Sequence, residues 1–194
     1  MAKTDPSSAK KERNKTIRWV VTIFLVTIFV SGTISFASDA IMEASSMVVA
    51  FLILLVIVLI GIIFDIIGMA VASADEKPFH SMAARKVAGA QESIRLLRNA
   101  ERVSSICNDV VGDICGVVSG SASATIAAQV LQNFEFSWPQ MVGLLLSALV
   151  AGMTVGGKAI GKVFAVRSCT QIVHSVGKLI WFIRHFPDSL KKKK

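Results

Sequence analysis

The chain has 194 residues, of which 53% are hydrophobic and only 18% are charged. Soluble domains carry about 25% charged residues, so this composition nearly excludes a soluble protein. Three cysteines without metal-ligand spacing form neither a disulfide framework nor a zinc motif. We therefore predict an all-α fold, an integral membrane helical bundle of three to four transmembrane helices with interfacial amphipathic helices.

The N-terminal segment combines a basic tail with an apolar run. Residues 1–18 are polar and basic, and we expect a cytoplasmic tail that is disordered until it meets lipid. Residues 19–37 are apolar and uncharged, which is long enough to span a bilayer. The same layout, ending in Ser35-Phe36-Ala37, is also typical of a cleaved signal peptide. Both alternatives, a transmembrane anchor and a signal peptide, stay open.

Three further apolar stretches follow. Met47 to Ala74 contains a single charge, Asp65, and is the clearest transmembrane helix. Residues 105–131 form a second stretch that is unusually rich in Ser, Gly and Asp, and residues 141–155 form the last clear span. The sequence thus predicts three spans besides the N-terminal one.

Two polar segments have the pattern of amphipathic helices. In residues 75–104, apolar side chains recur at helical spacing with Arg and Lys between them. These apolar positions are Phe79, Met82, Val87, Ala90, Ile94 and Leu97. A second such stretch covers residues 166–183, and we expect both to lie at the membrane interface. Residues 186–194 form a basic tail.

The basic residues predict the orientation. All 21 Lys and Arg lie in residues 1–18, in residues 75–104, or from Lys158 onward. The two intervening loops, residues 38–46 and 132–140, contain three acidic residues and no basic one. The positive-inside rule therefore places both termini in the cytoplasm. We expect the protein to lie in the cell (plasma) membrane, next to anionic lipids. The net charge of +8 is then explained by membrane topology and by contact with these lipids, and no nucleic-acid partner is needed.

Polar side chains inside the predicted spans are candidates for a cation site, because each buried charge costs about 2.5–3.5 kcal/mol on insertion scales. Carboxylate, amide and hydroxyl oxygens suit Mg²⁺, and Asp109 and Asp113 share one helix face. The candidate metal ligands are Asp65, Asn108, Asp109, Asp113 and Ser119. The alternative is that these residues lie near the interface or hydrogen-bond neighbouring helices.

Glycines recur in two of the predicted spans. Gly112, Gly116 and Gly120 allow close approach of another helix, either within the protomer or across a homodimer seam. A second set in the last span comprises Gly152, Gly156, Gly157 and Gly161. Because Gly weakens a helix by about 1 kcal/mol relative to Ala, we expect a break or hinge there. Carbonyl groups freed at such a break can bind a cation.

No enzyme motif is apparent, and we expect a protein without catalytic activity. His80, His174 and His185 have no partner at metal-ligand or triad spacing. Gly156-Gly157-Lys158 lacks the other residues of a phosphate-binding loop.

Three motifs carry a family resemblance: FDIIGMAVASADEKPF from Phe64, Ile106-Cys107-Asn108-Asp109, and GKAIGK from Gly157. Residues 47–185 resemble the transmembrane domain of the cyclin M/CorC family of magnesium transporters in the order and spacing of these motifs. That family has a Phe-Ser-x-Ser-Glu-x-Ala-like motif, a basic amphipathic connection, Ile-Gly-Asn-Asn and Gly-Glu-x-x-Pro-Lys. The resemblance implies a homodimer that binds or transports a divalent cation, Mg²⁺.

The chain departs from the family pattern at charged positions. Asp65 and Gly68 stand where the family has Ser and Glu, while Lys158 and Gly161 replace its Glu and Pro. A lysine opposes a cation path, so the alternative function is a non-transporting membrane scaffold or regulator that has lost the ion site. A holin-like membrane-remodelling protein is a third alternative.

The predicted orientation can be tested by cysteine labelling. In a background without the native cysteines, cysteines at Ser45 and Ser137 should react with an impermeant thiol reagent from outside intact cells. A cysteine at Ser93 should not react, because the basic segment that contains it faces the cytoplasm. Labelling of position 93 from outside would overturn the orientation.

Overall fold

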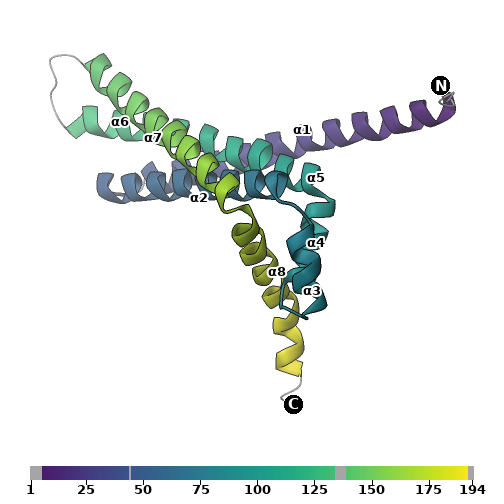
Figure 1. Cartoon of the computed structure of the whole chain (residues 1–194). Helices are drawn as coiled ribbons and strands as arrows, with labels where there is room; N and C mark the ends of the chain where they lie inside the picture. The colour runs from purple at the N-terminus through teal and green to yellow at the C-terminus, as the bar shows by residue number, and fades with distance from the viewer. Residues whose placement is uncertain (1–5, 44, 134–138, 192–194) are drawn as a thin grey trace.

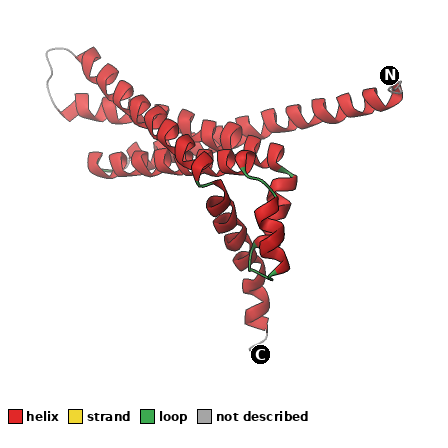
Figure 2. Cartoon of the chain, in the orientation of Figure 1, coloured by secondary structure: helices red, strands yellow, loops and turns green. Residues whose placement is uncertain are grey.

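The described part of the chain is entirely helical apart from short turns. The computed structural model describes residues 6–43, 45–133 and 139–191, and no strand occurs within them (Figures 1 and 2). The elements are α1 Pro6–Glu43, α2 Met47–Ser73, α3 Lys77–Ala84, α4 Ala90–Arg98, α5 Ala100–Ser105, the π-helix η1 Ile106–Gly112, α6 Asp113–Asn133, α7 Pro139–Arg167 and α8 Cys169–Lys191. The predicted all-α class is confirmed.

Four helical segments are long and apolar enough to cross a membrane, as the sequence predicts for an uncleaved chain. They are Thr16–Met42, Met47–Ser73, Ala100–Gln132 and Met141–Arg167. Helix α2 lies at the centre, where it contacts η1, α6 and α7, while α1 packs mainly along α6 (Figure 1). The N-terminal part of α1 extends beyond the other helices.

Two apolar clusters hold the two ends of the bundle together. The first contains Met42, Ala50, Leu54, Val58, Ala122, Ile126 and Val150. The second contains Ala70, Val71, Phe79, Ile94, Leu97, Ala165 and Val173. Between them, α2 contributes Gly61, Asp65 and Gly68 to the buried interior. The core is therefore two apolar layers with a polar layer between them.

Helices α3, α4 and α8 form a side lobe that runs across the direction of α2 at one end of the bundle (Figure 1). A close backbone contact joins α4 to α8. The Ser93 hydroxyl donates to the carbonyls of Gly89 at 2.9 Å and Val173 at 3.2 Å, and a side chain at Gly177 would collide with Ser93. The apolar face of α4 is therefore covered by protein.

The structure differs from the sequence predictions at the chain's polar segments. The expected disordered tail is helical from Pro6, because its Ala, Lys and Glu residues are good helix formers next to a stable helix. The predicted loop at residues 38–46 is also shorter, since α1 continues to Glu43. Part of the other predicted loop, residues 134–138, lies outside the described residues.

The predicted single amphipathic helix over residues 75–104 is three helices. The chain turns between α3 and α4, where Lys86 and Gly89 have φ angles of 56° and 86°, and it turns again at Asn99. Left-handed backbone of this kind ends a helix and favours glycine. The predicted break at the glycines of the last span is absent, since α7 is one continuous helix from Pro139 to Arg167.

The structure also refines the labelling test. Ser93 is fully buried, so a cysteine at that position would be protected from reagents on either side. Gln91 is exposed on the same helix and is the better reporter for the predicted cytoplasmic face. Ser137 lies outside the described residues, and Ser45 is half-buried in the turn between α1 and α2.

Candidate metal site and its internal lysine

An ion pair occupies the polar layer of the bundle. The Lys158 ammonium on α7 lies 3.2 Å from Oδ2 of Asp65 on α2, and it donates to the Gly112 carbonyl of η1 at 3.4 Å. The Asp65 side chain is 7% exposed and that of Lys158 is 21% exposed. The carboxylate charge is therefore neutralised within the protein by a lysine from another spanning helix.

Glycines bring the three helices close enough for this contact. A side chain at Gly112 would collide with Asp65 Oδ1, and one at Gly157 would collide with Ile62. Added Cβ atoms at Gly61 and Gly161 would likewise lie too close to Cys115 at 2.9 Å and to Ile66 at 2.7 Å. A side chain at any of these positions would force a neighbouring side chain on α2 or α6 to move.

The segment η1 gives this contact an unusual backbone. A π-helix adds a residue to the helical turn and leaves its hydrogen bonds in a different register, and such segments often occur at functional sites. Its Asn108 side chain donates from Nδ2 to Ser104 Oγ at 3.2 Å. Asn108 Oδ1 is buried with no hydrogen-bond partner among the described residues, and it lies where a side chain at Gly68 would have to be.

The structure brings two of the five predicted ligands to the same helix contact. Asp65 and Asn108 both lie between α2 and η1, on consecutive turns. Asp109 and Asp113 are exposed. Ser119 is buried, and its hydroxyl donates to the Gly116 carbonyl at 2.9 Å. The predicted set is thus divided between the bundle interior and its surface.

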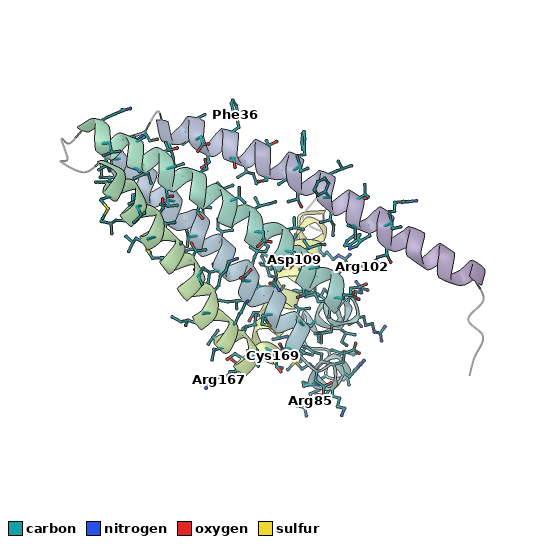
Figure 3. The ribbon with its side chains drawn as sticks, turned by 90° about the horizontal axis from the view of Figure 1, so that it is seen from above. Phe36, Arg85, Arg102, Asp109, Arg167 and Cys169 are labelled. Carbon is teal, nitrogen blue, oxygen red and sulfur yellow. The ribbon has the colours of Figure 1, made fainter. Side chains whose placement is uncertain are left out.

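Asp109 belongs to a separate cavity between α1 and α5. The cavity has a volume of about 710 Å³, and its lining includes Trp19, Glu101, Arg102 and Asp109. Asp109 Oδ2 accepts a hydrogen bond from Ser105 Oγ at 2.8 Å. Figure 3 shows Arg102 and Asp109 on the side of the bundle that faces α1, away from Arg167 and Cys169.

Metal-ligating side chains are sparse in the described ranges 6–43, 45–133 and 139–191. Within them, no group of three or more His, Cys, Asp or Glu residues lies close enough together to hold a metal ion. Asp65 has the right chemistry for a hard cation. Its charge, however, is already matched by the ammonium of Lys158.

The sequence analysis predicted that Lys158 opposes a cation path, but it did not predict the pairing of Lys158 with Asp65. The sequence places it after a span that ends at residue 155, where it counts as a cytoplasmic charge. In the structure α7 continues as a helix to Arg167, and the contacts of Lys158 with Asp65 and the Gly112 carbonyl place its ammonium inside the bundle. One sequence feature could have predicted this pair: two apolar helices each contain a charged residue, and the two charges have opposite signs. Buried charges are usually paired.

Comparisons with protein-family models, with curated proteins and with solved structures find no match for this chain.

The ion pair predicts a specific pattern of stabilities. Replacing Lys158→Met should lower the free energy of unfolding by about 3–5 kcal/mol, because it leaves Asp65 buried and unpaired. Asp65→Asn should also destabilise the protein, and the double variant should recover most of the loss. The measurement is denaturant titration of the purified protein in mild detergent.

The matched control is Lys162→Met, since Lys162 lies one turn further along α7 and is exposed. Its effect should stay within about 0.5 kcal/mol. If the loss of unfolding free energy in the double variant equals the sum of the losses in the two single variants, the two residues are not coupled.

Proposed function

We propose that this protein is a non-transporting membrane scaffold or regulator whose internal cation position is filled by its own Lys158. The observation that carries the proposal is the 3.2 Å contact between the Lys158 ammonium and the Asp65 carboxylate. The lysine is attached to the chain, so it cannot leave the bundle as a transported ion would. The pair therefore fixes α7 on α2 and keeps the interior electrically neutral.

A divalent cation would have to displace this lysine. Mg²⁺ gives up its waters reluctantly and binds through one or two carboxylates with near-ideal octahedral geometry. With Lys158 in place, Asp65 has no uncompensated charge with which to offset that dehydration. The ion pair thus opposes binding of the divalent cation that an unpaired Asp65 would attract.

The second candidate function is binding or transport of a divalent cation, Mg²⁺, as the resemblance to the cyclin M/CorC family implies. The observation that favours it is Asn108 Oδ1, a buried acceptor without a partner among the described residues. It lies on the same helix contact as Asp65. If Lys158 turned away, these two oxygens and the Gly112 carbonyl would offer a polar, oxygen-lined position.

We also propose that the protein lies in the cell membrane with its C-terminus in the cytoplasm, next to anionic lipids. The distribution of Lys and Arg supports this orientation. In this arrangement the side lobe of α3, α4 and α8 lies along the cytoplasmic surface. The exposed apolar side chains of α8, Leu179, Phe182 and Ile183, suit contact with the membrane interface.

The two candidate functions give different responses to Mg²⁺. For the scaffold, millimolar Mg²⁺ should leave the melting temperature of the purified wild-type protein unchanged, and proteoliposomes should show no more Mg²⁺ flux than empty vesicles. Lys158→Met, if it folds, should acquire stabilisation by Mg²⁺, because a ligand that binds only the folded state raises its stability. Lys162→Met is the control and should remain insensitive.

A Mg²⁺-dependent rise in the wild-type melting temperature, together with flux above that of empty vesicles, would reject the scaffold and favour the transporter. In that case Asp65→Asn should abolish both effects. Asp113→Asn should leave them intact, because Asp113 is exposed outside the helix contact.

We further propose a homodimer through the small-residue groove of α6 and α7. This groove has a volume of about 310 Å³ and is lined by Gly116, Gly120, Ser147 and Thr154 among others. Added side chains at Gly116 and Gly120 would meet no atom within 4 Å. These glycines therefore do not pack helices within the protomer, and close helix contact with a second copy explains their spacing.

The groove can be tested with a matched pair of glycine variants. Gly116→Leu should leave the protomer folded but make it run as a monomer in mild detergent, because the larger side chain fills the groove. Gly112→Leu should instead unfold the protomer, since Gly112 touches Asp65. A Gly116→Leu protein that remains a stable dimer would exclude this seam.

A further inference from the structure

The cavity between α1 and α5 lies near one end of three helical segments that are long and apolar enough to cross a membrane. Its walls include Thr16 and Ala100, which begin two of the spanning segments, and Ala72, which is one residue from the end of a third. Three spans therefore terminate around one cavity. Trp19 also lines it, and tryptophan is enriched where a bilayer meets water.

Both signs of charge line this cavity. Arg102 supplies a guanidinium, held over the ring of Trp19 with 5.5 Å between its Cζ and the ring centroid. Glu101 and Asp109 supply carboxylates, and the hydrogen bond from Ser105 orients that of Asp109. The cavity thus offers one fixed cation and two anions within a space of about 710 Å³, ample for a small polar group.

We propose that this cavity binds the headgroup of a zwitterionic phospholipid that carries a primary ammonium, such as phosphatidylethanolamine. Arg102 pairs with the lipid phosphate, for which the guanidinium fork is well suited. The ammonium donates hydrogen bonds to Asp109 and Glu101. The two halves of the headgroup carry the charges opposite to those of the cavity wall.

The charge balance argues against other membrane lipids. A net anionic headgroup would meet two carboxylates and one guanidinium, which repel it on balance. A choline headgroup has no N–H to donate to these carboxylates. Choline is recognised by aromatic cages, but Arg102 already covers the ring of Trp19.

The surroundings of the cavity suit a lipid rather than a soluble molecule. Along α1 beyond Trp19, Val20, Phe24 and Leu25 are exposed apolar side chains. An acyl chain attached to a headgroup in the cavity can lie along this surface. A soluble phosphate ester has no group that would use it.

The proposal can be tested by native mass spectrometry of the purified protein in micelles that contain equal amounts of phosphatidylethanolamine, phosphatidylcholine and phosphatidylglycerol. The wild type should retain phosphatidylethanolamine about tenfold better than the other two lipids. Arg102→Gln and Asp109→Asn should each reduce that retention about tenfold, because each removes a charge-assisted hydrogen bond. Both side chains are exposed, so the fold should persist.

Matched controls are Arg98→Gln and Asp113→Asn. Both residues are exposed and neither lines the cavity, so retention of phosphatidylethanolamine should stay at the wild-type level. Melting temperatures measured alongside identify any variant that does not fold. The charge reversal Asp109→Arg should shift the preference towards phosphatidylglycerol, because the wall then carries two cations and one anion.

Three results would overturn the proposal. One is equal retention of all three lipids by the wild type. Another is an equal loss of phosphatidylethanolamine in the control variants. The third is stabilisation of the protein by millimolar phosphoethanolamine or inorganic phosphate that matches the stabilisation by the lipid, which would indicate a site for a soluble anion.

Discussion

The need to neutralise one buried carboxylate organises the interior of this bundle. Asp65 stands alone as the charge within the 27 residues of α2, with an apolar cluster on either side of it along the bundle. A carboxylate in such surroundings is stable only with a close partner. Lys158 provides that partner from α7, so the mutual position of α2 and α7 is fixed at this point as well as by apolar packing.

Several features of the bundle serve this single contact. Gly112, Gly157 and Gly161 let η1 and α7 approach α2. The glycine repeat at positions 112, 116 and 120 therefore has two uses. Gly112 allows a close contact within the protomer, whereas Gly116 and Gly120 lie on a face that is open within the protomer. Spacing alone could not separate these uses, since each glycine in the repeat has the same sequence pattern and only the neighbouring helix distinguishes them.

The sequence was sufficient for the helical class and for the spans, because long uncharged apolar runs have few stable alternatives in a protein. It also identified Asp65 and Asn108 as polar groups of the interior. It ended the last apolar stretch at residue 155, whereas α7 continues as a helix to Arg167, since glycines and lysines resemble the end of an apolar helix. A lysine can stay inside an apolar helix bundle when an aspartate that is distant in the sequence neutralises its charge. Whether such a partner is close in space depends on the tertiary structure.

Other details depend on local backbone that composition does not reveal. The π-helix η1 and the turns around α4 arise in segments whose residues are compatible with an ordinary helix, apart from Gly89. The candidate ligands Asp109 and Asp113 were grouped with Asp65 because all three are acidic residues of apolar segments. Their separation follows from the direction in which each helix face points, since Asp109 and Asp113 are exposed while Lys158 of α7 covers Asp65.

The pairing of α2 with α7 also has a consequence for biosynthesis. Helix α2 is made about 90 residues before its lysine partner, so Asp65 must enter the membrane unpaired. The insertion cost of one carboxylate, about 2.5–3.5 kcal/mol, is small beside the favourable transfer of the long apolar helix that carries it. Helix α7 contains more Gly and charged residues, and it arrives when that carboxylate is already in place. Helix α2 thus provides a binding partner that assists integration of α7.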